Sequence, residues 1–282
     1  YIPGIENNKR PDVWIQITVP NEFQPVGKYN IGVSAGIETT VYPAEFIDGS
    51  NRMDLNLVSS EHSKQVASAC QFEKHDKQTN QKVGVLKLEK PIDTLFEGLD
   101  LDKYNKKPQN SGILKDIKED FCFLYTGHWL PGDFGQDRKN TGLMIHTFLD
   151  TFKGLGRKKP ALILKTNHVN YSLLDREETL KRINNIRKNM GINNLPNIYL
   201  LHGEMTDDEM NQLNNDNKVK AFLSFTKGEG YGRPLAEAAI TGKPVITTNW
   251  GGQRDFLHPD YNVLIGGELT NVHSSSANQF LL

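Results

Sequence analysis

The sequence predicts an α/β protein in two parts, each built around a parallel β-sheet. Short apolar runs of strand length alternate with segments of helical length along the 282 residues, as in parallel strands joined by crossovers. A polar stretch around residues 100–118 interrupts this alternation. Residues 221–247 then read as strand, glycine-rich loop, helix and strand. Together these patterns favour an α/β fold with two domains.

The first part of the chain alternates strand and helix signals. We predict strands at residues 13–19, 29–34 and 53–59, a helix at 61–71 and another short apolar run at 82–88. Residues 39–46 match neither pattern. Connections of these lengths indicate parallel strands joined by crossovers.

Residues 105–118 form the predicted linker. The stretch around them is rich in Lys, Asp, Asn, Pro and Gly and lacks an apolar period. We therefore place a first domain at residues 1–104 and a second domain at residues 119–282.

The second domain repeats the alternation. The helix after Asn140 carries Met144 and Phe148 on one face, a spacing that buries an apolar stripe. Two capping-box patterns mark further helix starts, Asp175-x-x-Glu178 and Thr206-x-x-Glu209. We predict strands in this domain at residues 120–126, 161–164, 197–201, 221–226 and 245–247.

The loop after residues 221–226 points to an anion site. It reads Lys-Gly-Glu-Gly-Tyr-Gly, and Pro234 then suits the first turn of a helix, where its missing N–H has no partner to lose. Gly242 is a plausible left-handed cap at the end of that helix. A helix start approached through glycines exposes backbone N–H groups and the positive end of the helix dipole.

Two carboxylates frame this loop. Glu229 lies within it, and Glu237 follows on the helix. Carboxylates repel phosphate, but they accept hydrogen bonds well from sugar hydroxyls. An anion site beside hydroxyl acceptors indicates a nucleotide sugar as ligand.

The residues E-G-Y-G-R-P-L-A-E, followed by G-K-P-V-I-T-T-N-W-G-G-Q-R-D, carry a family resemblance. They resemble the donor-site signature of retaining glycosyltransferases of the GT-B fold, most closely glycosyltransferase family 4. The resemblance covers most of the second domain and only part of the first. It implies two Rossmann-like domains, of which the first, on the acceptor side, is incomplete and the second holds the nucleotide sugar.

The resemblance also assigns roles within the motif. Glu229 is expected to hold hydroxyls of the donor sugar and is counted as catalytic, and Glu237 is expected to hold the ribose hydroxyls. Gly230 and Gly232 are expected to let the backbone approach the diphosphate, with Tyr231 packed over the sugar or phosphate.

Cations for the leaving diphosphate are expected after the first strand of the second domain. Lys139 resembles the family lysine of this region, although the loop is longer and Asn140 replaces a glycine. Its neighbour Arg138 is counted with it as a binding residue. His128 stands where family members have an arginine, and its charge is conditional near pH 7.

Three further residues complete the candidate site. Lys165 follows the next strand, so it should emerge at the same carboxyl edge of the sheet and act catalytically with Lys139. Arg233 is a candidate phosphate ligand, and His202 ends a strand where the base would lie. The alternative readings are an exposed first-turn arginine, a local hydrogen-bonding histidine and solvated lysines.

The resemblance implies retaining transfer of a hexose from a nucleotide diphosphate sugar to an acceptor hydroxyl. No cofactor is expected. No Asp-x-Asp signature lies in a loop after a predicted strand, and no His/Cys cluster has the spacing of metal ligands, so we expect no metal. The donor is expected to be UDP- or GDP-linked, and the acceptor to be a glycan, a lipid-linked group or a small molecule. Two alternatives remain, a nucleotide-sugar binding module without turnover and another GT-B enzyme such as a sugar-nucleotide epimerase.

Bulk properties exclude little. The net charge of -1 gives no argument for nucleic acid as a partner. No apolar run approaches the ~20 residues that span a bilayer, and nothing at the N-terminus resembles a signal peptide. Cys70 and Cys122 have no metal-ligand spacing. These features predict a reducing, cytoplasmic location.

Overall fold

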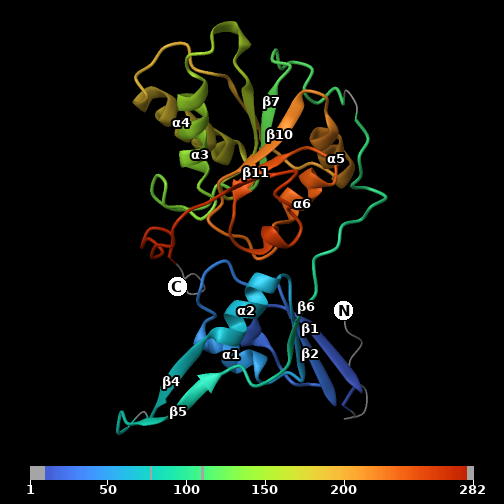
Figure 1. Ribbon diagram of the computed structural model, residues 1–282, viewed down its shortest axis with the longest axis vertical. Helices are drawn as coiled ribbons and strands as arrows, with labels where there is room; N and C mark the ends of the chain where they lie inside the picture. The colour runs from blue at the N-terminus through green and yellow to red at the C-terminus, as the bar shows by residue number, and fades with distance from the viewer. Residues whose placement is uncertain (1–9, 77, 109–110, 278–282) are drawn as a thin grey trace. The chain divides into compact units, whose positions relative to one another are not determined.

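The chain divides into two compact units. The computed structural model describes residues 10–76, 78–108 and 111–277 (Figure 1). The first unit is Tyr1–Glu97 and the second is Gly98–Leu281. The boundary between them precedes the predicted linker at 105–118. Leu114 and Ile117 from that stretch are buried in the core of the second unit.

The first unit contains a parallel sheet of four strands in the order β1-β2-β3-β6. Helices α1 and α2 follow β2 and β3 in the chain (Figure 1). These elements are β1 (Val13–Ile17), β2 (Tyr29–Ser34), α1 (Ala44–Ser50), β3 (Leu55–Val58), α2 (Glu61–Ala69) and β6 (Ile92–Thr94). The expectation of parallel strands with crossovers therefore holds for this sheet.

Two details of the first unit differ from the prediction. The helix predicted at 61–71 ends at Ala69, and the chain continues as β4 (Gln71–His75). This strand pairs antiparallel with β5 (Lys82–Lys87), so the apolar run at 82–88 lies in a separate hairpin. Residues 39–46, left without an assignment, include the start of α1.

One face of the first sheet is covered and the other is largely open. Ile47 of α1 and the nearby Phe23 and Met53 are almost completely buried. On the edge strand β1, Ile15 and Ile17 are 56% and 77% exposed. Parallel sheets generally bury both faces, so this apolar surface is unusual for the architecture.

The second unit is a doubly wound domain with a six-stranded parallel sheet in the order β12-β11-β10-β7-β8-β9. Read from β9, this is the 3-2-1-4-5-6 order of dinucleotide-binding domains. The strands are β7 (Cys122–Thr126), β8 (Ala161–Lys165), β9 (Ile198–Leu201), β10 (Val219–Ser224), β11 (Val245–Thr248) and β12 (Val263–Ile265).

Helices cover both faces of this sheet (Figure 1). On one face α3 and α4 bury Met144 and Phe148 against Leu162. On the other face α5 and α6 bury Leu213 and Leu235. These helices are α3 (Thr141–Phe152), α4 (Leu173–Asn189), α5 (Asp207–Asn215) and α6 (Arg233–Ala239). Because successive side chains of each strand point to opposite faces and both faces are covered, the strands are mostly apolar.

Several local predictions are confirmed. Thr206 and Glu209 form the predicted capping box at the start of α5. Gly242 is left-handed, with φ of 78°, where a helix was predicted to end. Among the described residues, no helix has the length and apolarity needed to cross a bilayer.

Candidate functional site

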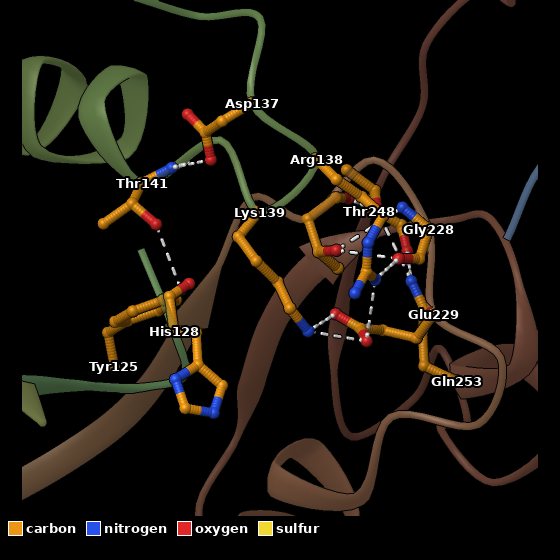
Figure 2. A network of polar contacts seen from close by, with 11 residues as sticks. Tyr125, His128, Asp137, Arg138, Lys139, Thr141, Gly228, Glu229, Thr248 and Gln253 are labelled. Atoms are coloured by element: carbon orange, nitrogen blue, oxygen red, sulfur yellow. Dashed lines mark hydrogen bonds and ion pairs between the residues drawn. The ribbon is translucent and has the colours of Figure 1, made fainter. Parts of the chain in front are cut away.

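The site lies where the second sheet reverses its winding. β7 and β10 are adjacent and parallel, but their following helices cover opposite faces. The loops that leave their carboxyl ends lie at the position where ligands bind in folds of this type. One loop carries Arg138 and Lys139, and the other carries Glu229 (Figure 2).

Buried polar groups hold the loop after β7 in place. Asn140 caps α3 in the left-handed conformation, with φ of 54° and without a capping side chain. The Asp137 carboxylate accepts instead from the backbone N–H of Thr141 at 3.3 Å. Thr141 Oγ1 lies 3.0 Å from the buried Tyr125 hydroxyl (Figure 2). These contacts hold Lys139 immediately before the helix.

The loop after β10 is held by close backbone packing. Glu229 accepts a backbone hydrogen bond from Gly252 at 2.8 Å. A Cβ on Gly252 would lie 2.1 Å from the carbonyl oxygen of Gly230, so only glycine fits there. Gly232 has φ of 100°, which also favours glycine. In this structure two loop glycines are thus explained by backbone geometry.

The two loops meet through an ion-pair cluster. Lys139 Nζ lies 2.6 and 2.7 Å from the two carboxylate oxygens of Glu229. Arg138 Nη1 lies 3.3 Å from Glu229 Oε2 and donates to the Gly228 carbonyl at 2.8 Å (Figure 2). The backbone N–H of Lys227 also donates to the Arg138 carbonyl at 2.8 Å. Two cations face one carboxylate, so the cluster has a net charge of about +1.

Glu229 remains ionised in this cluster. Its side chain is 8% exposed, and that burial pushes the pKa of the carboxyl group upward. The charges of Lys139 and Arg138 outweigh burial and hold the pKa of Glu229 below its ordinary value. A permanently charged carboxylate can accept hydrogen bonds but cannot donate a proton near pH 7.

Glu237 lies in a second cluster. α6 begins at Arg233, so Glu237 begins the second turn, and Arg233 Nε donates to its carboxylate at 2.9 Å. Glu237 is 7% exposed, and burial raises the pKa of its carboxyl group, although the hydrogen bond from Arg233 acts in the opposite direction. The two carboxylates of the motif thus have opposite pKa shifts.

Lys165 ends β8 at the same edge of the sheet and is 8% exposed. Its Nζ donates to the carbonyl oxygen of Gly203 at 2.5 Å and lies 5.3 Å from the ring centre of Tyr171. Burial lowers the pKa of this lysine. The contacts of Lys165 therefore lie with the loops after β8 and β9.

His202 is engaged inside the protein. Its side chain is 4% exposed, and its Nε2 lies 2.9 Å from Asp175 Oδ2. Asp175 also accepts backbone N–H bonds from His168 and Val169. The predicted cap at Asp175 is therefore wrong, because Ser172 caps α4 and frees the Asp175 carboxylate to join neighbouring loops.

The remaining predicted residues differ in accessibility. His128 is exposed beside the Lys139 loop (Figure 2). Tyr231 is 9% exposed, and its ring packs 5.0 Å from that of Phe256, centre to centre. This packing supports the loop from within.

The predicted site residues therefore fall into three groups. Arg138, Lys139 and Glu229 are in direct contact, Arg233 pairs with Glu237, and Lys165 and His202 line the loops after β8 and β9. The prediction missed Tyr104, which donates to Asp207 at the start of α5, and Asp175, which contacts His202. Tyr104 stands in a polar stretch without a motif, and Asp175 fitted a capping pattern.

Across residues 10–76, 78–108 and 111–277, no group of three or more His, Cys, Asp or Glu side chains is arranged to hold a metal ion. Both cysteines are free thiols.

Comparison with known proteins identifies the fold. Neither a protein-family model nor a curated relative matches the sequence. Anabaena HepE in complex with UDP-glucose aligns with a TM-score of 0.56 and 17% identity over 84% of this chain and 58% of that one. Sucrose-phosphate synthase from Thermosynechococcus elongatus aligns with a TM-score of 0.63 and 12% identity over 93% and 62%.

A third similar structure is the pneumococcal O-GlcNAc transferase GtfA in complex with UDP and GlcNAc. It aligns with a TM-score of 0.51 and 13% identity over 85% of this chain and 42% of that one. The chain thus spans less than two thirds of the length of these neighbours. Its fold is α/β with two Rossmann-like units of the GT-B type.

Proposed function

We propose that this chain forms the donor-binding part of a glycosyltransferase that moves a sugar from a nucleotide diphosphate sugar to an acceptor hydroxyl. The observation that carries the proposal is the contact of Glu229 with Lys139 and Arg138 at the winding reversal of the second sheet. A buried carboxylate with two cations offers acceptors for hydroxyls and an excess positive charge for phosphate.

The cations would stabilise the leaving diphosphate. Negative charge develops on the diphosphate as the bond between the sugar and the phosphate oxygen breaks. Lys139, Arg138 and Glu229 together have a formal charge of +1, and both cations are largely shielded from water, with 14% and 20% exposed side chains. Charges held in place before the reaction need no reorganisation in the transition state. Lys165 is proposed to add to this field.

The two glutamates would orient the donor. Glu229 is proposed to accept hydrogen bonds from the sugar, and Glu237 from the ribose. The lowered pKa of Glu229 suits an acceptor and argues against a general acid. Gly230, Gly232 and Tyr231 are proposed to line the diphosphate and sugar, with His128, Arg233 and His202 at the margin of the nucleotide.

We further propose that transfer is hexosyl, proceeds with retention and needs neither divalent metal nor cofactor. The protein cations supply the positive charge at the diphosphate, and an oxocarbenium-like transition state needs no strong protein nucleophile. We propose UDP as the nucleotide, because the HepE and GtfA structures named above contain UDP or UDP-glucose.

Calorimetric titration with UDP, GDP and ADP in the presence of EDTA tests the donor site. We expect one nucleotide to bind, and Lys139→Met and Glu237→Ala each to weaken it at least tenfold, or ~1.4 kcal/mol. Lys158→Met is the matched control, because Lys158 is exposed in the turn before β8, at the opposite edge of the sheet. A folded chain that binds none of the three nucleotides contradicts the proposal.

Hydrolysis of the matching nucleotide sugar then separates an enzyme from a binding module. We expect slow release of the sugar in EDTA, with its anomeric configuration retained by NMR. Binding without any hydrolysis favours the module, an inverted product contradicts retention, and epimerised donor favours the epimerase alternative.

A further inference from the structure

The second unit contains a cavity of about 470 Å³ between α3, α4 and the loop that joins β7 to α3. Its volume lies within the range of small-molecule sites, roughly 300–1,000 Å³. The helices α3 and α4 lie side by side on one face of the sheet (Figure 1). The loop contributes Trp129, Phe134 and Asp137 to the wall, and Lys139 follows two positions after Asp137. The cavity therefore adjoins the candidate donor site but is walled by other residues of the same loop.

Hydrogen bonds hold this loop in place at both ends of its wall. The backbone N–H of Trp129 donates to the Asn167 carbonyl at 2.8 Å, and the Trp129 carbonyl accepts from His168 Nδ1 at 2.7 Å. Further along, the N–H of Asp133 donates to Ser275 Oγ at 2.9 Å. A wall that is fixed before a ligand arrives loses little conformational entropy on binding.

Two aromatic rings line the cavity beside the start of α3. Trp129 is 5% exposed, whereas Phe134 is 57% exposed. Both rings pack next to Gly142, where an added Cβ would lie 3.3 Å from Phe134 Cδ2 and 3.7 Å from Trp129 Cζ2. The ring of Phe134 also meets that of His146 edge-on, with centres 5.8 Å apart. Phe134 thus offers a supported apolar face that water still reaches.

α4 contributes a polar stripe to the opposite part of the wall. Arg182, Asn185 and Asn189 are separated by three and four positions, so they share one face of the helix, and all three line the cavity. Each asparagine amide can both donate and accept hydrogen bonds. Arg182 Cζ lies 5.7 Å from the ring centre of Trp129, and Arg182 Nε donates to Glu178 at 3.4 Å.

The charges of the wall favour a neutral ligand. Arg182 faces two carboxylates of the same wall, Asp133 and Asp137, and it already contacts Glu178. A phosphate or carboxylate ligand would therefore find no excess positive charge. A sugar ring instead has an apolar face that can stack on an aromatic ring, and hydroxyl groups at its edge that suit amides.

We propose that this cavity binds a neutral sugar unit of a glycan, separately from the nucleotide sugar. The aromatic face of Phe134 stacks on the sugar, and Asn185 and Asn189 bond its hydroxyls. Because the same loop carries Lys139, the glycan is held beside the donor site. In this last respect the inference rests on the proposed function, and it names a glycan as the class of acceptor.

The test titrates the whole chain with neutral trisaccharides, namely maltotriose, cellotriose, mannotriose and triacetylchitotriose, by saturation-transfer NMR and calorimetry. Trigalacturonic acid is the anionic comparison. We expect at least one neutral trisaccharide to bind and the anionic one not to bind. Phe134→Ala and Asn185→Ala should each weaken binding of that trisaccharide about three- to tenfold, because each removes one contact of ordinary strength.

Matched controls exist for both variants. Asn184→Ala changes an exposed asparagine one position earlier on α4, which points to another side of the helix. Phe96→Ala removes a phenylalanine of the first unit that is 52% exposed, close to the value for Phe134. Neither control should change trisaccharide affinity. Thermal unfolding of all four variants reports any general loss of stability.

Two further readouts distinguish this cavity from the donor site. Saturating UDP should leave the trisaccharide bound, and Asn185→Ala should leave the affinity for UDP unchanged. In a transfer assay with the matching nucleotide sugar, Phe134→Ala should raise the KM for the trisaccharide about three- to tenfold with kcat nearly unchanged, because the cavity binds the glycan without touching the reacting atoms.

The outcomes separate the inference from the proposed function. If the chain binds no nucleotide but binds a neutral trisaccharide through Phe134 and Asn185, the donor proposal fails and the glycan site stands. If UDP binds but no neutral trisaccharide does, the glycan site is overturned and the donor site stands. Displacement of the trisaccharide by UDP, tighter binding of trigalacturonic acid, or equal effects of the variants and their controls would overturn the glycan site as well. Binding without extension of the trisaccharide would overturn its role as acceptor.

Discussion

Glu229→Gln is expected to weaken the fold and strengthen diphosphate binding at the same time. The substitution keeps the shape of the side chain but removes its charge. Lys139 and Arg138 then lose their carboxylate partner, and the net charge of the cluster rises from about +1 to about +2. Stability and UDP affinity should therefore change in opposite directions.

The loss of stability follows from the distances. At an effective dielectric constant of ~20, the pair at 2.6 Å has a gross attraction of about 6 kcal/mol and the pair at 3.3 Å about 5 kcal/mol. Desolvation offsets most of this, and breaking a buried pair costs ~3–5 kcal/mol in practice. Because both cations retain some exposure, we expect about 3 kcal/mol. That loss corresponds to a fall in the Tm of the second unit of about 6–12 °C.

The contribution of Glu229 to stability should change with pH in a defined direction. The pKa of Glu229 is lowered in the folded protein, so its contribution to stability is present above the pKa of an unfolded glutamate and is lost as the pH falls. The difference in Tm between the parent and Glu229→Gln should therefore shrink on acidification. Calorimetric scans between pH 4 and 8 measure it.

UDP titration supplies the second half of the test. One additional uncompensated charge should tighten UDP binding roughly three- to tenfold at low salt, and less at high salt. Glu177→Gln, on the exposed surface of α4, is the control and should change neither quantity. A fall in UDP affinity that parallels the fall in Tm would refute the charge argument and show that Glu229 mainly holds the cations in place.

Three further outcomes follow from the same contacts. Gly252→Ala should destabilise the second unit by ~1–3 kcal/mol or more in denaturant titration, because its Cβ would overlap the carbonyl of Gly230, whereas Gly154→Ala, with open space around the added methyl, should not. Glu237→Gln should weaken UDP binding yet raise the Tm near neutral pH. The raised pKa of Glu237 means that its contribution to stability is present at low pH and is lost as the pH rises through that pKa. Asp175→Asn should lower stability above the ordinary pKa of an aspartate by ~3 kcal/mol, because a buried carboxylate with several donors is removed. The pKa of Asp175 is lowered, so the parent should approach the variant in thermal stability as the pH falls.

The second unit was predictable because its signals are local. β8 (Ala161–Lys165) is apolar at nearly every position, which is typical of a strand buried on both faces. Thr206 and Glu209 cap their own helix, so no distant residue was needed to predict that start. The glycine-rich loop and Glu229 were likewise evident from the order of residues along the chain.

The β4–β5 hairpin of the first unit could not be predicted from local sequence signals. β4 has the sequence Gln-Phe-Glu-Lys-His, with a single apolar residue and no alternation to mark a strand. Its stability depends on pairing with β5, in which Gln71 pairs with Lys87, 16 positions later, and His75 with Lys82, 7 positions later. The helix signal before it simply continued into this stretch in the prediction.

The clusters of the site depend on the strand order, which no local pattern in the sequence predicts. Lys139 and Glu229 are 90 positions apart and meet only because β10 inserts beside β7. Tyr104 and Asp207 are 103 positions apart, and the segment around Tyr104 has the composition of a linker. Asp175 and Ser172 both fit the pattern of a helix start. The structure shows that Ser172 caps α4, whereas Asp175 contacts His202, and this contact cannot be read from the local sequence.

Hydrogen bonds hold residues 104–107 along α5, and they limit where the chain can bend between the two units. The polar stretch looks long enough to act as a loose tether, but from Tyr104 onward it belongs to the second unit. Any hinge between the two units must therefore lie in the short stretch after Glu97 and before Tyr104. A hinge so close to Tyr104 would make this buried residue, through its hydrogen bond to Asp207, the first fixed point of the second unit.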